Sequence, residues 1–504
     1  MSILRAKPLP LAAAVALLAG ALLSCCSSSS DDLALTTATP RRISARGGES
    51  LTLRGSGFTA GSSVRLGDEP VDELEIVSPT EARFKTPPLF AGPATVVVKT
   101  ADGKTAELLG GVEVLPLDLR FVEAPPYALP SASDSGMDPS IKGAALADFD
   151  GDGDADLITC DAAVPCRFVQ NDGLGNFSDP VDSPSKPRFP AGIPDVRALA
   201  AADFDGDGDL DLFLGYGAGG PDMGGPGAVY VNDGEATFTD AGKDALAPDE
   251  DAFAAVAIGD LDGDGRPDLV IANSTADSVP LRILLNTSEG GSIHFTPALE
   301  GAVPARDWIA SAITLADIDG DEDLDILLAT PGAADGLTLR LLLNDGGLFE
   351  EASGGLPAGP KGAITALAVG DVNGDGAADI LTIGAGQDRL LVNDGAGHFF
   401  DATTGSMPLD ASKGTSAALV DLDRDRDLDL VIGNAGATTR LYLNDGAGRF
   451  ADHTPLLPIR ADETVWVGVA NVDGDADSDL LVLNAAPGPA RLYLSVEPPA
   501  DDAH

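Results

Sequence analysis

Acidic residues recur along this chain at a fixed spacing that suits a bound metal ion. A loop of the form D-x-D-x-D-x-x-x-D-[LI] occurs seven times, and we number these loops one to seven in chain order. In loop two, side-chain oxygens at positions 1, 3, 5 and 9 of Asp203–Asp211 and the backbone carbonyl of position 7 can surround one hard cation, while Gly206 and Gly208 permit the tight turn. Calcium takes about six to eight oxygen ligands, so the loops predict calcium sites.

The predicted ligand set covers positions 1, 3, 5, 7 and 9 of every loop, and the sequence therefore predicts up to seven Ca²⁺. Positions 1, 3, 5 and 9 hold Asp in 26 of 28 cases, and Asn in the remaining two. The candidates are Asp148, Asp150, Asp152, Asp154 and Asp156; Asp203, Asp205, Asp207, Asp209 and Asp211; Asp260, Asp262, Asp264, Arg266 and Asp268; Asp317, Asp319, Asp321, Asp323 and Asp325; Asp371, Asn373, Asp375, Ala377 and Asp379; Asp421, Asp423, Asp425, Asp427 and Asp429; and Asn471, Asp473, Asp475, Asp477 and Asp479.

Some loops depart from this pattern. Leu214 stands where an EF-hand would have a bidentate Glu, and a strand follows the loop, so a helix–loop–helix site is excluded. Loop six carries Arg424 and Arg426 at positions usually held by Gly, loop four has Glu322, and loop seven begins with Asn471. We expect loops one and two to bind calcium most tightly, and loops six and seven most weakly. Magnesium is less suitable, because it prefers few carboxylates and retains water.

The elements that must position these loops repeat with them. The loop starts are separated by 55, 57, 57, 54, 50 and 50 residues. An apolar strand precedes each loop and another follows it, and then comes a hairpin such as Leu391–Phe399, in which Asn-Asp-Gly is predicted to form the turn because these residues tolerate positive φ. Four strands per repeat of this length make one propeller blade.

The last repeat lacks a fourth strand, and an unpartnered strand precedes the first repeat. After Arg491–Leu494 the chain runs into prolines, whereas Leu117–Val122 contains Phe121, which matches the Phe that ends the other repeats. We expect this early strand to complete blade seven and close the ring, which would remove exposed sheet edges. The fold class predicted for residues 116–497 is therefore all-β, a seven-bladed β-propeller.

The seven loops and their intervening strands resemble the FG-GAP/VCBS repeats of integrin-α-like β-propellers. The resemblance implies that each calcium loop joins the first two strands of a blade and that the ion rigidifies the propeller. Upstream, residues 38–115 alternate apolar and polar residues in short runs, and Gly55-Ser-Gly-Phe58, Pro87-Pro88 and Gly92-Pro93 are similar to IPT/TIG immunoglobulin-like domains. In that family, such a small β-sandwich often acts as a spacer or binding module.

The N-terminus has the pattern of an export signal. Arg5 and Lys7 precede an apolar run that is too short to span a membrane and ends Leu22-Leu-Ser-Cys25, which resembles a bacterial lipobox. We expect residues 1–24 to be a lipoprotein signal peptide, Cys25 the lipidated residue, residues 25–37 a Ser/Asp-rich tether and residues 498–504 a tail. An ordinary cleaved signal is the alternative. The sequence thus predicts a lipid-anchored protein of the bacterial cell envelope, on either its surface or its periplasmic side.

Two further cysteines lie in the exported part. Cys160 and Cys166 flank five residues near the ends of adjacent predicted strands, and disulfides persist outside the cytoplasm. We expect a disulfide that closes this hairpin. Two free thiols are the alternative, and the spacing is a poor match to a zinc site.

Composition and charge limit the function. The 504 residues carry 80 Asp and Glu against 31 Lys and Arg, a net charge of −49, which excludes a general nucleic-acid binder. The hydrophobic content of 44% excludes a disordered acidic tail. The four histidines are scattered, and the chain contains no G-x-S-x-G, H-E-x-x-H or Walker sequence, so no catalytic constellation is predicted.

A ligand rim is predicted on the face opposite the loops, where the segments entering each first strand differ most. Exposed tryptophans beside charge would suit sugars or protein partners, although both tryptophans could instead pack between blades. The sequence predicts adhesion or recognition of a protein or polysaccharide by a monomer, with a polysaccharide lyase or hydrolase, or an architectural envelope component, as alternatives. The rim candidates are Arg306, Asp307, Trp308, Glu463 and Trp466.

Overall fold

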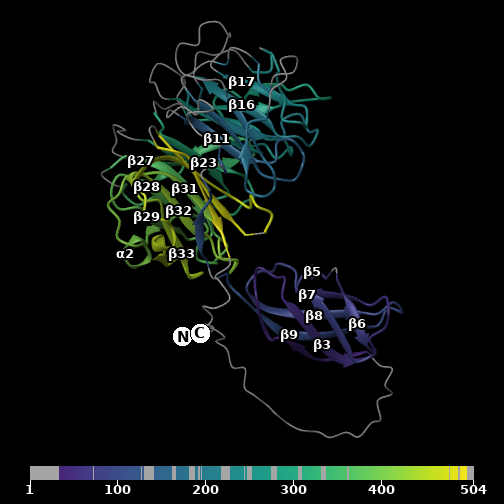
Figure 1. Ribbon diagram of the computed structural model, residues 1–504. Coiled ribbons are helices and arrows are strands. Elements are labelled where there is room, and N and C mark those ends of the chain that lie inside the picture. The colour runs from purple at the N-terminus through teal and green to yellow at the C-terminus, as the bar shows by residue number, and fades with distance from the viewer. Residues whose placement is uncertain are drawn as a thin grey trace, which may run out of the picture. The chain divides into compact units, whose positions relative to one another are not determined.

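A computed structural model gives the fold of the chain (Figure 1). It describes residues 33–71, 73–117, 119–125, 128–129, 141–161, 166–180, 188–190, 193, 196–216, 227–242, 244–246, 253–273, 281–304, 309–330, 337–359, 362–475, 477–485 and 488–496. Almost every described element is a strand, which confirms the predicted all-β class. No helix among the described residues is long and apolar enough to cross a membrane.

The chain divides into two compact units. The first comprises Met1–Arg41, Ser50–Thr86 and Ala94–Val112, and the second comprises Arg42–Glu49, Pro87–Pro93 and Glu113–His504. The acidic loops all lie in the second unit.

The N-terminal strands form two sheets, in the orders β1-β3-β7-β6 and β2-β9-β8-β4-β5. Alternation of apolar and polar residues buries one face of each strand; in β3, Leu51 and Leu53 are fully buried while Ser50 and Arg54 are exposed. This is the small β-sandwich that the sequence predicts. Its strands are β1 (Ala34–Thr39), β2 (Arg42–Ser44), β3 (Ser50–Ser56), β4 (Ser63–Leu66), β5 (Glu69–Pro70), β6 (Glu75–Ser78), β7 (Glu81–Lys85), β8 (Gly92–Lys99) and β9 (Thr105–Leu115).

The repeats form antiparallel four-stranded sets, which we call blades one to seven in chain order. Blades one to five are separate sheets, and blades six and seven belong to one eight-stranded sheet because β32 also pairs with β35. Blades one to three are β11 (Ile141–Ala147), β12 (Asp156–Asp161), β13 (Arg167–Asn171) and β14 (Phe177–Ser178); β15 (Val196–Ala202), β16 (Asp211–Tyr216), β17 (Gly227–Asn232) and β18 (Phe238–Asp240); and β19 (Phe253–Gly259), β20 (Asp268–Asn273), β21 (Leu281–Asn286) and β22 (Phe295–Pro297).

The remaining blades follow the same order, with three short helical turns after the fourth strands. These turns are η1 (Ser353–Gly355), α2 (Thr403–Ser406) and η2 (Thr454–Leu456). Blades four to seven are β23 (Ala312–Ala316), β24 (Asp325–Ala329), β25 (Leu339–Asp345) and β26 (Leu348–Glu351); β27 (Ile364–Gly370), β28 (Asp379–Gly384), β29 (Arg389–Asn393) and β30 (Phe399–Asp401); β31 (Gly414–Val420), β32 (Asp429–Ala437), β33 (Arg440–Asn444) and β34 (Phe450–Asp452); and β35 (Asp462–Ala470), β36 (Asp479–Asn484), β37 (Arg491–Ser495) and β10 (Phe121–Glu123).

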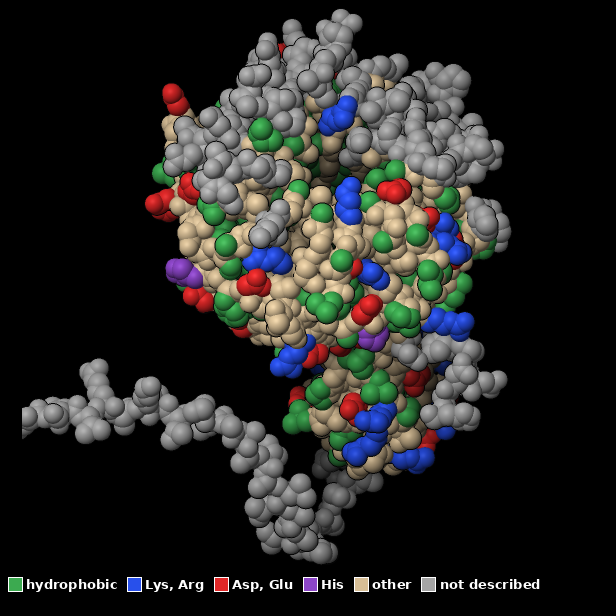
Figure 2. Space-filling model, turned by 90° about the vertical axis from the view of Figure 1, so that its left-hand side faces the viewer, with side chains coloured by type: hydrophobic (Ala, Val, Ile, Leu, Met, Phe, Trp, Pro, Cys, Tyr) green, Lys and Arg blue, Asp and Glu red, His purple; other side chains and the backbone are tan. Residues whose placement is uncertain are grey.

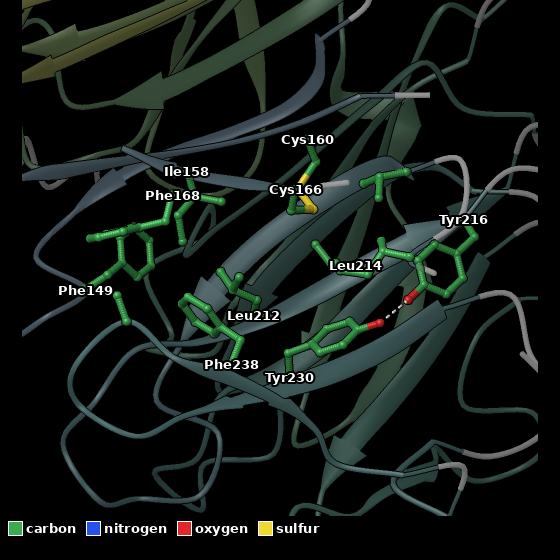
Figure 3. Packing of buried hydrophobic residues seen from close by; sticks show 13 residues of the cluster. Phe149, Ile158, Cys160, Cys166, Phe168, Leu212, Leu214, Tyr216, Tyr230 and Phe238 are labelled. Atoms are coloured by element: carbon green, nitrogen blue, oxygen red, sulfur yellow. Dashed lines mark hydrogen bonds between the residues drawn. A yellow bond between two sulfur atoms is a disulfide. The ribbon is translucent and has the colours of Figure 1, made fainter. Parts of the chain in front are cut away.

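The second strand of each blade lies in the core. All six residues of β16 and all five of β24 are buried, so these strands are continuous apolar runs apart from their first Asp. Hydrophobic clusters join neighbouring blades: Phe149, Ile158 and Phe168 of blade one pack with Leu212 and Phe238 of blade two (Figure 3). Burial of apolar area between blades is the dominant favourable term for such an assembly.

The early strand β10 completes blade seven, as the sequence predicts. It pairs antiparallel with β37, and Phe121 lies opposite Ser495 in the register in which Phe450 lies opposite Asn444 in blade six. The first strands of successive blades are neighbours, and β35 of blade seven also lies beside β11 of blade one. The count of seven blades in the ring stays a prediction, with which this strand order agrees.

In blades one to six, the hairpin between the third and fourth strands turns at glycines, joined in blade two by Ala236 with a φ of 52°, and not at its asparagine. Gly395 and Gly397 have φ of 78° and 72°, whereas Asn393 is the last residue of β29 and is buried. The prediction of a hairpin is correct, but the assignment of positive φ to the Asn is wrong. The Asn is retained for another reason, described below.

Candidate metal centres

The side chain of the first residue of each acidic loop accepts hydrogen bonds from backbone N–H groups further along the same loop. In loop two, Oδ1 of Asp203 accepts the N–H of Gly206 at 2.7 Å, and Oδ2 accepts the N–H of Gly208 at 3.0 Å. The same pair of bonds occurs in loops one, three, four and five. Glycines at these positions have positive φ, between 74° and 102° in these five loops, which explains their place in the pattern.

The aspartate at position 9 is the first residue of the second strand and is buried. In loop two, Oδ2 of Asp211 accepts the N–H of Phe204 at 3.0 Å, and Oδ1 accepts the N–H of Asn232 at 2.9 Å. Equivalent bonds are made by the position-9 Asp of every loop. This residue therefore ties its loop to the third strand of its own blade.

The loops bring the predicted ligands together. One oxygen from each of positions 1, 3 and 9 lies within 4.8 Å of the others in loops one to four, and in loop six the oxygens of Asp421, Asp423 and Asp425 do so. Position 5 caps the turn, because its Oδ1 accepts the N–H of position 7, as in Asp207 to Asp209 at 3.0 Å. At position 7 the backbone N–H is held by the position-5 side chain, as in Arg266 and Ala377. The guanidinium of Arg266 also pairs with Asp264 and donates to the carbonyl of Asn286 at 2.8 Å.

The electrostatics of these clusters favour a cation. Burial, followed by the charge of the neighbouring position-5 acid, raises the pKa of Asp150, Asp205 and Asp319. Burial raises the pKa of the position-9 acids to about 6 or 7. Oδ1 of Asp150 and of Asp319 is buried without a hydrogen-bond partner. An orphaned carboxylate oxygen in a group of three acids fits calcium, which accepts only oxygen ligands in such sites.

Loops four and six adopt the same turn despite side chains in place of Gly. Glu322, Arg424 and Arg426 have φ of 76°, 61° and 77°, a region that costs a non-glycine residue about 1 kcal/mol or more. Burial, with the charges of Asp425 and Asp429, raises the pKa of Asp423 to about 8. Loop six thus keeps the acidic cluster that the sequence predicts, at a cost in backbone strain.

Loops five and seven differ from the others. In loop five, Nδ2 of Asn373 donates to Oδ2 of Asp379 at 3.0 Å, so an amide replaces one carboxylate and removes its repulsion with the other. In loop seven, Nη1 of Arg46, which belongs to the same compact unit, donates to Oδ2 of Asp475 at 3.0 Å, and the guanidinium also pairs with the buried Asp477. Loop seven therefore already holds a positive charge supplied by the chain.

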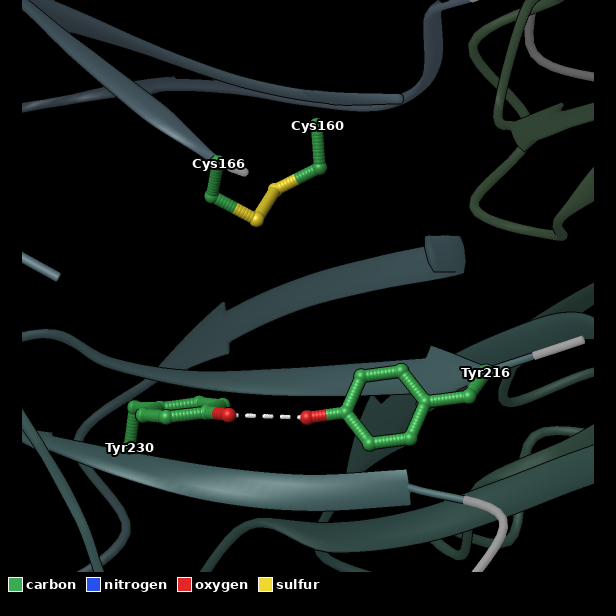
Figure 4. The surroundings of a disulfide bond; sticks show 4 residues. All are labelled: Cys160, Cys166, Tyr216 and Tyr230. Carbon is green, nitrogen blue, oxygen red and sulfur yellow. Dashed lines mark hydrogen bonds between the residues drawn. A yellow bond between two sulfur atoms is a disulfide. The ribbon is translucent and has the colours of Figure 1, made fainter. Parts of the chain in front are cut away.

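The other predicted residues have different fates. The structure joins Cys160 and Cys166 in a disulfide that closes the hairpin between β12 and β13 and lies beside the hydrogen-bonded pair Tyr216 and Tyr230 (Figure 4).

Cys25 and the rim residues 306–308 lie outside the described residues. Glu463 is exposed, whereas Trp466 is half-buried and packs on the cluster between blades seven and one. For Trp466 the packing alternative is therefore the better description.

Sequence reasoning missed the asparagine at the end of the third strand in blades one to six. It is buried and donates both its main-chain and its side-chain N–H to acidic loops, as in Asn286 of blade three. A signal was present: the third blade has Asn-Thr-Ser in place of Asn-Asp-Gly, so the Asn persists where the turn residues change.

Comparisons with known proteins identify both parts of the chain. A model described as an FG-GAP-like repeat matches residues 148–214, 216–271, 260–328, 317–382, 371–432 and 421–482, and the model of the IPT/TIG domain matches residues 33–110. These matches confirm the two resemblances that the sequence predicts.

Curated relatives match only in part. Cartilage acidic protein 1 of Homo sapiens is 29% identical over 163 residues, which are 31% of this chain and 24% of that protein. The Mus musculus protein of the same name is 29% identical over 167 residues, 31% of this chain and 25% of its own length. The match therefore spans about a quarter of these relatives.

Solved structures with a similar course of the chain include two bacterial proteins. A rhamnogalacturonan lyase of Bacillus licheniformis is 13% identical, with a TM-score of 0.41 over 92% of this chain and 90% of that one. An auxiliary nutrient binding protein of Bacteroides ovatus is 11% identical, with a TM-score of 0.39 over 93% and 99%. These scores are too low to carry an argument about activity.

Proposed function

Because this chain belongs to the FG-GAP-like repeat family, whose model matches it from residue 148 to 482, we propose that it is a calcium-stabilised adhesion or recognition protein. FG-GAP repeats and an IPT/TIG domain fit an extracellular recognition protein. The observation that carries the calcium part is the convergence of three acids in each of five loops, with buried carboxylate oxygens that lack a partner in three of those loops.

Calcium would be held by oxygens of the acids at positions 1, 3, 5 and 9 and by the position-7 carbonyl, and it would neutralise their mutual repulsion. An ion that binds only the folded state raises stability by mass action. Loops one to four offer the full acid set, with strain at Glu322 in loop four and with Arg266 paired to Asp264 in loop three. Loop six offers three acids with strain at two arginines, and loops five and seven offer less. We therefore expect the calcium-dependent stabilisation to come chiefly from loops one to four.

The test is thermal unfolding with millimolar calcium and with EDTA. We expect calcium to raise Tm, and Asp205→Asn to reduce that increment because it removes one charge from loop two. Glu350→Gln is the matched control: it removes the same charge from an exposed position of β26, outside the loops, and should leave the increment unchanged. Equal melting curves with calcium and with EDTA would refute the calcium proposal.

For the partner, we propose noncovalent binding of a protein or polysaccharide by a monomer, without a catalytic step. On the face in Figure 2, acidic and basic side chains of the described residues are scattered and do not form one large patch of either sign. This supports recognition by local contacts over a purely electrostatic partner such as nucleic acid. A glycan array probed with the lipid-free protein in the presence of calcium tests whether the partner is a polysaccharide. Release of unsaturated sugar from pectic substrates would overturn the proposal that the protein has no catalytic step.

For the location, we propose a lipid anchor at Cys25 on the bacterial cell envelope. The proposal is supported by the lipobox-like sequence before Cys25 and by the disulfide at Cys160, which suits an exported chain. Cys25→Ala should move the protein from the membrane to the soluble fraction. A variant that still sediments with membranes would contradict the anchor.

A further inference from the structure

Six asparagines each bond to two neighbouring acidic loops at once. In blade three, the main-chain N–H of Asn286 donates to Oδ1 of Asp268 in its own loop at 2.7 Å, while Nδ2 donates to the carbonyl of Phe204 in loop two at 3.0 Å. Phe204 is position 2 of its loop, and its own N–H is held by Asp211 of that loop. A single side chain thus spans from one candidate ion site to the next.

The same bridge occurs around the propeller. Nδ2 reaches the position-2 carbonyl of the preceding loop at 2.7–3.0 Å in every case, and Asn171 of blade one makes it to Val472 of loop seven, which joins the end of the chain to its beginning. In four blades Nδ2 also lies within 3.1–3.2 Å of the position-8 carbonyl of its own loop. The six residues are Asn171, Asn232, Asn286, Asn344, Asn393 and Asn444.

One bridge is missing. In blade seven the equivalent residue is Ser495, which keeps the main-chain bond to Asp479 at 2.8 Å, but its buried Oγ has no hydrogen-bond partner. No Asn therefore joins loop seven to loop six. That boundary instead carries a strand pairing, of Ala435 with Glu463 and Ala437 with Asp462.

We infer that the six asparagines are positioning residues that couple the acidic loops in the order seven, one, two, three, four, five, six, with the only opening at Ser495. An ion that orders one loop fixes the carbonyl at position 2, and the bridging Asn transmits that order to the position-9 Asp of the next loop. The coupling rests on the proposed calcium binding, and by linkage it acts in both directions along the series.

The coupling has an ordered consequence. Loops one to five each have a bridge on both sides, whereas loops six and seven are the two ends of the series. Loop six carries two strained arginines, and the guanidinium of Arg46 pairs with loop seven. The four loops with the full acid set are therefore each bridged on both sides, and so is loop five, in which Asn373 replaces one carboxylate.

The test compares two matched changes at equivalent positions. Asn286→Ser reproduces the residue of blade seven and removes the bridge between loops two and three, and Ser495→Asn installs the missing bridge. Calcium binding is followed by isothermal titration calorimetry, and Tm is measured with calcium and with EDTA. We expect Asn286→Ser to weaken two of the binding events by on the order of fivefold, the effect of one lost hydrogen bond, and to reduce the calcium-induced rise in Tm.

Ser495→Asn should raise Tm in EDTA and also raise calcium affinity, and it provides a second test if Asn286→Ser does not fold. If Asn286→Ser lowers Tm by the same amount with and without calcium and leaves the calcium affinity unchanged, the hydrogen bond only stabilises the fold, and the coupling is overturned. A Tm that falls in Ser495→Asn would contradict the missing bridge. A wild-type protein without any calcium response would instead refute the proposed calcium binding itself.

Discussion

Aspartates at positions 3 and 9 occur together in six of the seven loops, and their surroundings give them different tasks. The position-9 acid, such as Asp211, is fully buried and has both oxygens occupied by backbone N–H groups. The position-3 acid, such as Asp205, has its pKa raised chiefly by burial and next by the charge of Asp207. Position 9 therefore builds the loop even in the absence of metal, and position 3 needs a cation to offset its desolvation.

At the residue scale, spacing was sufficient to predict the acidic clusters and insufficient to predict the bridges. The acids lie within nine residues of one another, so the local geometry of the loop is enough to bring them together. The carbonyl that Asn286 reaches is 82 residues away in sequence, and only the packing of adjacent blades brings it near. A turn-forming Asn and a bridging Asn look the same in one repeat.

Backbone strain in loop four gives a prediction for one residue. Glu322 has a φ of 76° and an exposed side chain, so Glu322→Gly should stabilise the metal-free protein by about 1 kcal/mol through relief of strain. Equilibrium unfolding in EDTA measures it. Glu322→Ala is the control, because it removes the same charge and keeps the strain; equal stabilisation by both variants would attribute the effect to charge.

Among the elements, the pairing of β10 was predictable although it is the strand most distant in sequence from its partners, because the last repeat lacks a fourth strand. Seven repeats with one missing fourth strand, and one spare strand ending in Phe, leave a single consistent pairing, and the structure pairs Phe121 with Ser495. The rim residues were less predictable. Whether a rim side chain is exposed or buried depends on how neighbouring blades pack, and the repeat spacing does not reveal this. Trp466, for example, packs on blade one.

Closure by β10 predicts a large effect for one side chain. Phe121 is 5% exposed, so Phe121→Ala should lower the free energy of unfolding by about 3 kcal/mol or more through loss of apolar burial and a residual cavity. Chemical denaturation provides the measurement. Val122→Ala is the matched control on the same strand, since Val122 is 43% exposed, and similar losses in both variants would argue against closure through Phe121.

The disulfide predicts a modest effect on its hairpin. Cys160 and Cys166 are six residues apart, and closing so short a loop restricts the unfolded chain by about 2 kcal/mol. The double variant Cys160→Ala with Cys166→Ala should lose about that much stability in denaturant. Treatment with a reductant should lower the stability of the wild type and leave the double variant unchanged; a wild type that does not respond would leave the bond without a stabilising role.

At the scale of the whole molecule, the excess of acid has a structural distribution. The net charge of −49 includes the acids of seven loops that adjoin neighbouring blades. Repulsion among them opposes the same blade packing that brings them together. A metal-free propeller should therefore be least stable where these acids are ionised, and the loops should make its stability depend on pH and calcium together.

The position-9 acids set the direction of that pH dependence. Burial raises their pKa to about 6 or 7 in the folded state, against about 4 in an unfolded chain. The stabilisation from their protonated form is complete below about pH 4 and is lost as the pH rises through about 7. In EDTA, Tm should fall by several degrees between about pH 5 and pH 7.5, and calcium should oppose this fall increasingly, because its ligands must be deprotonated.

Salt distinguishes this buried effect from repulsion across the acidic surface. Added salt screens exposed charges far more than buried ones, so the fall of Tm in EDTA should persist at about 0.5 M KCl. Differential scanning calorimetry at pH 5 and pH 7.5, with and without calcium and with and without salt, measures how Tm depends on each of these conditions. A fall that vanishes in salt would assign it to surface charge, and a Tm that rises with pH in EDTA would contradict the raised pKa of Asp156 and its six equivalents.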